Sequence, residues 1–245
     1  MKRYTKMKDS GVEWIGEIPE NWELRKGSTI GDYSKGSGIK KDEVRESGLP
    51  CVRYGEIYTH YDLKFTETKS FINESSGKIL VEYGTLLLTG SGETLEDIGK
   101  CIVYIGNESI YIGGDIIILK PKEDILPLFL SYSFNSEPMR IQKELVGRGG
   151  IIVHIYSKGL REIWFPLPSK PEQTAIVAFL DEKTSKIDEL IAKKERKIEL
   201  LKEYRQSLIS EVVTGKIDVS DYAKASLDMS NYPKASSDES EEIVI

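Results

Sequence analysis

One uninterrupted helical run most constrains what this chain can fold into. Residues 172–213 contain no glycine and no proline, are dense in charge, and carry a sparse line of apolar residues. From Ile187 onward these apolar positions recur near every 3.5 residues, which is typical of a helix that packs along another helix. At about 1.5 Å per residue the run would extend roughly 60 Å, longer than a compact domain is wide.

The predicted seam of this helix consists of the apolar residues at that spacing, which are Ile187, Leu190, Ile191, Ile198, Leu201, Leu208 and Val212. Lys194 and Arg205 occupy the two steps that are not apolar, and they are candidates for setting the register of a helix pair. We therefore predict three parts: a globular domain over residues 1–170, a long spacer and dimerisation helix over 171–216, and an acidic tail over 217–245.

The ends of the helix have their own signals. Prolines within residues 165–171 are predicted to break the chain, and Pro171 with Glu172 suits a first helical turn. Gly215 is the expected residue just past the C-terminal end. From Ser220 onward the composition is rich in Ser, Asp, Glu, Lys and Ala, and disorder is expected there.

The charge is unevenly distributed along the chain. The net charge is −6, yet the sequence from Asp218 onward holds seven acidic and two basic residues. Residues 171–216 balance at nine of each sign, so residues 1–170 carry only about −1. A near-neutral domain can still present a basic face, so the global charge does not exclude a nucleic-acid partner.

The sequence shows no sign of secretion or of a membrane. Its N-terminus is polar, and no apolar segment approaches membrane-spanning length, so a soluble cytoplasmic protein is expected. Cys51 and Cys101 lie far apart and away from any histidine cluster, which argues against a metal site and a disulfide.

Short apolar runs separated by glycines fill residues 31–155. Five of them have strand length and β-branched or aromatic content, at residues 51–54, 78–82, 85–89, 101–105 and 115–119. The predicted fold class is α+β: a glycine-rich mixed or antiparallel sheet domain with a few helices, followed by the long helix as one arm of an antiparallel coiled coil.

Three further segments carry specific expectations. Residues 10–22 hold two tryptophans among glycines and a proline, and they are predicted to be an extended strap without regular structure. Trp14 and Trp22 would anchor it, either on the domain's own core or on a partner. One helix is predicted over residues 127–145, and a last strand over 151–155.

No catalytic motif stands out. The phosphate loop G-x-x-x-x-G-K-[ST], a G-x-G-x-x-G after a strand, H-E-x-x-H, and the Asn/Asp-Pro-Pro-Tyr/Phe signature of adenine methyltransferases are absent. His60 and His154 have no recognisable Ser or Cys nucleophile, and His154 is expected to be structural. We expect a binding protein with no catalytic residue, metal or cofactor of its own.

The loops suit a DNA partner. They mix glycine, which lets a backbone approach a surface closely, with Lys and Arg for phosphates or guanine edges and with hydroxyl side chains. The loops concerned are residues 35–41, 53–61, 89–94 and 147–150. A plain structural role for these loops is the competing interpretation.

Several runs together resemble a known family. Residues 9–22, 35–39, 48–58, 88–92, 165–168, 172–176, 200–209 and 213–218 are similar, in this order, to the specificity subunits of type I restriction–modification systems. The resemblance covers nearly everything before the tail. It implies a target-recognition domain that reads one part of a split DNA sequence, and a spacer helix that packs antiparallel with a second helix.

The resemblance also implies partners. These are double-stranded DNA, modification subunits that use S-adenosylmethionine to methylate adenine N6, and a translocase/nuclease subunit driven by ATP. Typical members carry two recognition domains and two spacer helices, whereas this sequence has one of each. A two-fold homodimer reading an interrupted palindrome is therefore expected. Pairing with another half-subunit, an inactive truncated fragment, and a coiled-coil adaptor that binds no DNA are the alternatives.

For DNA contacts the candidate residues come from the polar loops, and they are Lys35, Lys40, Lys41, Arg53, Tyr54, Tyr58, Ser91 and Arg148. Core or turn roles for Tyr54 and Tyr58 are equally open.

Overall fold

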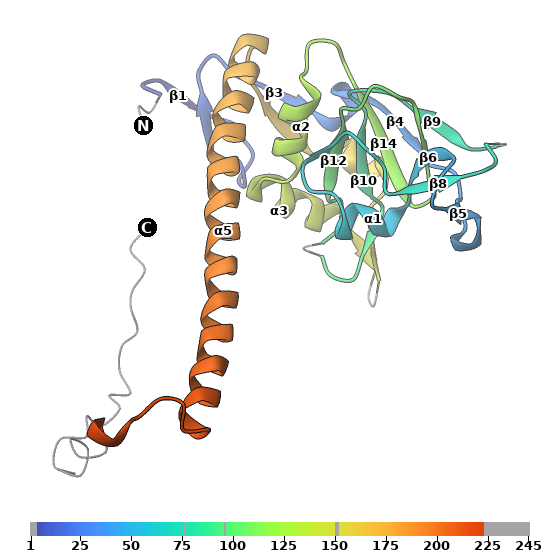
Figure 1. Cartoon of the computed structure of the whole chain (residues 1–245). Coiled ribbons are helices and arrows are strands. Elements are labelled where there is room, and N and C mark those ends of the chain that lie inside the picture. Colours follow the sequence, from blue (N-terminus) through green and yellow to red (C-terminus); the bar gives the residue numbers. More distant parts are fainter. Residues whose placement is uncertain (1–3, 76, 96, 150–151, 223–245) are drawn as a thin grey trace. The chain divides into compact units, whose positions relative to one another are not determined.

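The computed structural model describes residues 4–75, 77–95, 97–149 and 152–222. They fall into two compact units, and the chain passes from the first to the second at Glu182–Lys183. The sheets belong to the first unit. Helix α5 (Lys170–Val213) begins in the first unit and supplies most of the described residues of the second (Figure 1).

A five-stranded sheet with apolar residues on both faces forms the centre of the first unit (Figure 1). Its strands, in spatial order, are β4 (Gly31–Lys35), β14 (Ile116–Pro121), β10 (Leu86–Thr89), β12 (Cys101–Tyr104) and β7 (Lys64–Phe65). Leu86 and Leu88 of β10 enter one buried cluster, and Leu87 enters the other. Burial on both faces explains why the three inner strands β14, β10 and β12 are continuous apolar runs instead of alternating patterns.

Different elements cover the two faces. Helices α2 (Pro127–Phe134) and α3 (Glu137–Val146) pack on the first cluster through Phe129, Phe134 and Met139. The second cluster takes Val52, Val81, Ile110 and Ile112 from a smaller sheet. That sheet has the order β5 (Val44–Arg45), β8 (Ser70–Ile72), β6 (Leu49–Val52), β13 (Ile110–Ile112) and β9 (Ile79–Val81).

Shorter elements complete the first unit. Strand β1 (Met7–Asp9) pairs with β2 (Glu17–Pro19), and β3 (Glu23–Lys26) pairs with β17 (Trp164–Leu167). A three-stranded sheet has the order β11 (Ser91–Gly92), β16 (Val153–His154) and β15 (Arg148–Gly149). The remaining helical turns are η1 (Gly27–Thr29), η2 (Lys41–Glu43), α1 (Tyr54–Thr59) and α4 (Ser157–Leu160).

The α+β fold class with a long C-terminal helix is confirmed, and so are the strands predicted near residues 79, 86, 101 and 116. The strand predicted over residues 51–54 is right only in part, because β6 ends at Val52 and Tyr54 begins α1. The coiled-coil partner of the long helix stays a prediction.

The single helix predicted over residues 127–145 is wrong, because two helices occupy this segment. Helix α2 ends at Phe134, and α3 begins at Glu137 after Asn135 and Ser136. Pro138 lies in the first turn of α3, where its missing N–H is not needed. The proline therefore starts a new helix where the prediction extended an old one.

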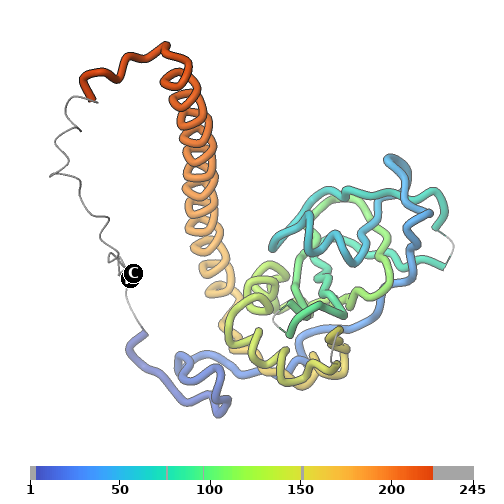
Figure 2. Tube along the Cα trace, turned by 90° about the horizontal axis from the view of Figure 1, so that it is seen from below, coloured from blue at the N-terminus to red at the C-terminus, as the bar shows by residue number. Residues whose placement is uncertain are grey.

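Two segments predicted to be irregular contain strands. Residues 10–22 include β2, and the proline-containing segment before α5 forms β17, which pairs antiparallel with β3. Figure 2 shows the blue segment of β3 beside the gold segment of β17. Pro166 is compatible with this ladder because both strands of a two-stranded sheet are edge strands. On an edge strand a proline can direct its nitrogen, which carries no hydrogen, away from the partner strand, so no ladder hydrogen bond is lost.

Helix α5 has defined ends. It begins at Lys170, and the Glu172 carboxylate accepts hydrogen bonds from Trp22 Nε1 at 3.3 Å and Ser169 Oγ at 3.0 Å. At the other end the backbone N–H of Lys216 donates to Glu211 O, and Gly215 has a φ of 72°. This is a Schellman cap, and it confirms Gly215 as the residue just past the C-terminal end.

No helix within the described ranges is both long enough and apolar enough to cross a membrane. The tail residues 223–245, on which the prediction of disorder largely falls, lie outside the described residues.

Candidate nucleic-acid interface

Two glycine-rich turns lie against each other beside the central sheet. A Cβ atom on Gly36 would lie 2.0 Å from the carbonyl oxygen of Gly113, so no larger residue fits at that approach. The backbone N–H of Ser37 donates to Ile112 O at 3.1 Å. Strand β4 ends at this contact, and its last residue, Lys35, is exposed beside it. We call the surface formed by these two turns and the neighbouring turn at Ser91 the rim.

Asp115 joins the first two turns of the rim to the turn around Ser91. It has a left-handed φ of 63°, and its backbone oxygen accepts a hydrogen bond from Gly90 N at 2.8 Å. One carboxylate oxygen lies 3.7 Å from the Lys35 ammonium, and the other accepts from Ser91 Oγ at 2.7 Å. The loops around residues 35 and 91, far apart in sequence, are thus held together by one side chain.

Two tyrosines of α1 hydrogen-bond to the same turn. The Tyr54 hydroxyl donates to Ser91 O at 2.6 Å, and the Tyr58 hydroxyl lies 2.7 Å from the same oxygen. Tyr58 also lies within hydrogen-bonding distance of Thr89 Oγ1 and Asp97 O. Burial raises the pKa of Tyr58. Both hydroxyls therefore position the turn, which favours the structural alternative for these residues.

The three-stranded sheet brings Arg148 to this region. In its ladder Arg148 pairs with His154, and His154 pairs with Ser91 on the other side. Arg148 is exposed, whereas Ser91 is buried and its hydroxyl is occupied by Asp115.

The structure thus gathers six of the eight predicted DNA residues around one rim, and they are Lys35, Arg53, Tyr54, Tyr58, Ser91 and Arg148. The other two, Lys40 and Lys41, lie at the start of the turn η2, and both are exposed. Whether any of these residues contacts DNA stays a prediction.

Sequence reasoning missed a buried lysine that anchors this rim. Lys143 of α3 is 4% exposed, and its ammonium donates to Gly99 O at 2.9 Å. Burial lowers the pKa of Lys143 to about 8. The helical spacing of α3 places Lys143 beside the buried Met139 and Gln142, which is the signal that could have identified it.

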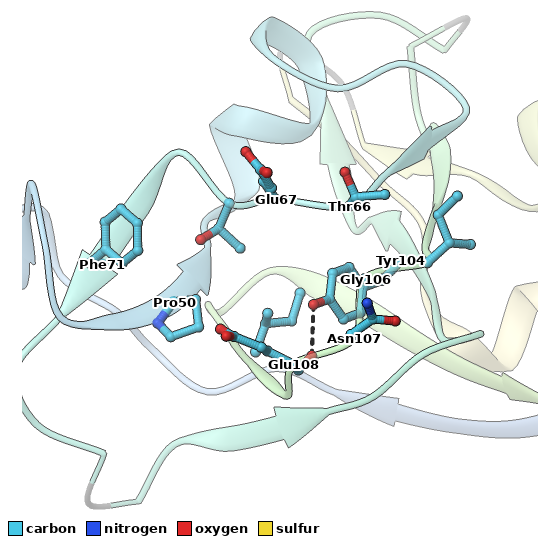
Figure 3. A pocket seen from close by; sticks show the side chains of 11 residues that line it. Pro50, Thr66, Glu67, Phe71, Tyr104, Gly106, Asn107 and Glu108 are labelled. Atoms are coloured by element: carbon cyan, nitrogen blue, oxygen red, sulfur yellow. Dashed lines mark hydrogen bonds between the residues drawn. The ribbon is translucent and has the colours of Figure 1, made fainter.

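A separate hollow of about 420 Å³ lies between β6, the chain after β7 and the turn after β12 (Figure 3). Glu67 and Glu108 line it, its lining includes no lysine or arginine, and Tyr104 donates to Glu108 O at 2.7 Å. Such a hollow does not attract phosphate. Across the described part of the chain, no group of three or more His, Cys, Asp or Glu side chains could hold a metal ion.

The predicted seam of α5 is open to solvent. Ile187, Leu190 and Leu201 are between 54% and 59% exposed, and Ile191 and Ile198 are about half exposed. Leu208 is 38% exposed, and Val212 is partly buried. The described residues of the second unit give this helix no apolar core of their own, so its seam is available to a partner.

Comparisons with known proteins agree on one family. The model of the type I restriction modification DNA specificity domain matches residues 19–200. The type I restriction enzyme MjaVIII specificity subunit of Methanocaldococcus jannaschii is 30% identical over an alignment of 223 residues, gaps included, and the alignment covers 84% of this chain and 49% of that protein. The EcoKI specificity subunit of Escherichia coli is 25% identical over an alignment of 210 residues, and the alignment covers 82% of this chain and 44% of that one. The chain spans about half the length of the curated relatives it matches.

Solved structures share the fold. A structure described as the basis of complex assembly and conformational transition of the type I R-M system aligns with a TM-score of 0.61 at 20% identity, over 79% of this chain and 46% of that one. The HsdS subunit from Thermoanaerobacter tengcongensis aligns with a TM-score of 0.53 at 19% identity, over 74% and 41%.

Proposed function

The chain belongs to the family of type I restriction–modification DNA specificity subunits, and on that premise we propose that it reads one half of a split target sequence in double-stranded DNA. The observation that carries this proposal is the convergence of the predicted loops on one rim. Lys35, Arg53 and Arg148 supply cations there, while Asp115, Tyr54 and Tyr58 hold the turns in place.

In this proposal the rim contacts bases and the exposed lysines contact the backbone. Lys35, Lys40 and Lys41 are exposed and reach toward solvent, as phosphate contacts require. Ser91 serves the turn and not the DNA, because its hydroxyl is already bonded to Asp115 and its side chain is buried. A buried, satisfied hydroxyl has no hydrogen to offer a base.

The chemistry belongs to partner subunits. The chain docks modification subunits through α5, and those subunits use S-adenosylmethionine to methylate adenine. A translocase/nuclease subunit with ATP can join them. The role of this chain is non-catalytic recognition. Its proposed partners, DNA and the modification subunits, place its action in the cytoplasm.

The exposed seam of α5 supports a second helix as its companion. A second copy of this chain is the simplest source, since an antiparallel two-fold pair buries the same seam on both helices. Each copy would read one half-site, and the full target would be an interrupted palindrome. The length of α5 would then determine the distance between the half-sites.

Mapping of methylated adenines tests the proposal directly. DNA from cells that express this protein with a modification subunit should carry methyl groups at a single split motif, palindromic if the chain forms a homodimer. Light scattering of the purified complex should give two copies of the chain. DNA without any sequence-specific mark contradicts the recognition function and favours a protein-binding adaptor. One copy per complex contradicts the homodimer alone.

A further inference from the structure

Glu56 is a buried carboxylate that holds an arginine. Its side chain is 6% exposed, in the first turn of α1. One of its oxygens accepts a hydrogen bond from the backbone N–H of Arg53 at 3.1 Å, and the other accepts from Arg53 Nε at 3.3 Å. Ser70 Oγ donates to the same carboxylate. A buried charge with three donors has a fixed position, so Glu56 fixes the guanidinium beside it.

The Glu56 contact uses one edge of the Arg53 guanidinium and leaves the other free. Within the described residues, no hydrogen bond or ion pair engages the terminal nitrogens Nη1 and Nη2 of Arg53. The Arg53 side chain is 30% exposed, so part of it reaches solvent although Nε is bonded to the buried Glu56. Gly113 lies against Arg53, because a Cβ there would meet Arg53 Cα at 3.3 Å. The glycine therefore leaves room beside the arginine.

Arg53 lies in the middle of the candidate interface. Its neighbour Gly113 contacts the turn at Gly36, next to Lys35, and the following residue Tyr54 donates to Ser91 O. The Lys35 side chain is 68% exposed, more than twice the fraction of Arg53. Duplex DNA approaching this rim would present phosphates to the projecting lysine, and base edges to the recessed, oriented arginine.

We propose that Arg53 donates from Nη1 and Nη2 to O6 and N7 of a guanine in the major groove, and that Glu56 is the positioning residue for this contact. Two parallel N–H groups of an arginine match the two acceptors of guanine, and no other base pair presents that pattern. This inference rests on the proposed function, and it assigns a base to one residue of the site.

The test removes the acceptor atom from DNA. After the target has been mapped, duplexes are made in which each guanine of the half-site is replaced in turn by 7-deazaguanine, which lacks N7. The full chain, assembled with its modification subunit, should bind one such duplex about tenfold more weakly than the natural one. Substitution at the other guanines should have smaller effects.

Variants connect this loss to the two residues. Arg53→Ala should bind the natural and the 7-deazaguanine duplexes equally, and Arg53→Lys should keep general DNA affinity without the discrimination. Glu56→Gln keeps the size of the side chain but removes its charge, and should reduce the discrimination to about threefold. Arg45→Ala is the matched control, because Arg45 is exposed and donates to the carbonyl oxygens of Asp42 and Val44; it should retain the full tenfold discrimination.

Two results would overturn the inference. One is a mapped target in which no guanine shows sensitivity to 7-deaza substitution in the wild-type protein. The other is an Arg53→Ala protein that keeps the wild-type sensitivity. In both cases a sequence-specific methyl mark would leave the proposed function standing, so the two failures are distinguishable. If Glu56→Gln does not fold, the analogue series on the wild type and on Arg53→Lys still decides.

Discussion

The two units of the chain treat their apolar residues in opposite ways. In the first unit Leu87 and Ile102 are fully buried, and two clusters fill both faces of the central sheet. In the second unit Ile198 and Leu201 remain 51% and 55% exposed on a helix. The first unit contains its own core, whereas the helix depends on a partner for the packing from which most helices gain their stability.

Truncation of one leucine in each unit tests this contrast most strongly. Leu87→Ala should cost the first unit about 2–5 kcal/mol of unfolding free energy, because it leaves a cavity between two packed layers. Leu201→Ala should leave the unfolding of the first unit unchanged. Urea denaturation followed by tryptophan fluorescence measures both, and equal losses in the two variants would remove the distinction between the units.

The pH dependence of stability tests whether Lys143 is buried within the first unit. Its pKa falls from the ordinary value of 10.5 to about 8 because burial disfavours the ammonium. Between these values the unfolded chain holds more protons than the folded one, so the contribution of Lys143 to stability rises with pH across that window. Compared with that of Lys143→Met, the unfolding free energy of the wild type should therefore rise by about 3 kcal/mol between pH 7 and pH 10.5.

Denaturation curves at pH 7, 8, 9 and 10 measure this difference. Because Tyr58 and Cys101 also have raised pKa values from burial, the comparison uses the difference between wild type and variant, in which most of their effect cancels. A difference that stays constant from pH 7 to 10 would show that Lys143 is solvated in solution.

A charged residue in the seam of α5 tests whether the second unit associates through this seam. Ile198→Asp should raise the dissociation constant of the proposed dimer at least about tenfold, because the pair would bury an unpaired carboxylate. Gln206→Asp, on the same helix but next to the seam position Arg205, is the control and should associate like wild type. Sedimentation or light scattering measures both proteins, and an unchanged mass for Ile198→Asp would place the partner elsewhere.

The smallest expected effect lies where α5 begins. Burial alone would raise the pKa of Glu172, but hydrogen bonds from Ser169, Trp22 and Asn21 outweigh it and hold the pKa below its usual range. The stabilising contribution is therefore complete above pH 4.5 and is lost as the pH falls through the lowered value. Since this carboxylate is largely solvated, Glu172→Gln should cost under about 1 kcal/mol at pH 7.

The role of Glu172 can also be measured locally, at the N-terminal segment that it contacts. Tyr4 and Asn21 also bond to this carboxylate, so limited proteolysis of the N-terminal segment should be faster in Glu172→Gln than in wild type. Asp218→Asn, which changes an exposed acid remote in sequence, is the comparison. Equal cleavage rates in the two variants would mean that Glu172 does not hold the segment.

Local patterns in the sequence predicted the elements better than their pairing. The apolar runs at β10, β12 and β14 were recognisable because each is a continuous stretch buried on both faces. The β17 strand was not, since Pro166 within it and Pro168 after it argue for a break, and its partner β3 lies far away in the chain. Likewise Pro138 gave no means of deciding between a kinked helix and a new one.

In the candidate interface, too, the sequence predicted the segments better than the contacts between them. Glycine, lysine and tyrosine in the loops indicated which segments would come together, and six predicted residues do surround one rim. The sequence did not separate residues that face solvent from residues that support the backbone. Ser91, Tyr54 and Tyr58 were grouped with Lys35, although their hydroxyls bond to Asp115 or to backbone oxygens of the turn.

By itself, then, the sequence determined the period of the long helix, the strand content of the domain and the family resemblance, because these depend on the order and spacing of neighbouring residues. Only the tertiary structure decided which side chains are free to bind. Glu56 and Arg53 are three positions apart, yet the burial of that carboxylate depends on Ser70 and on the sheet that packs over α1. Hydrogen-bond partners and burial come from contacts across the fold, and no local pattern in a sequence records them.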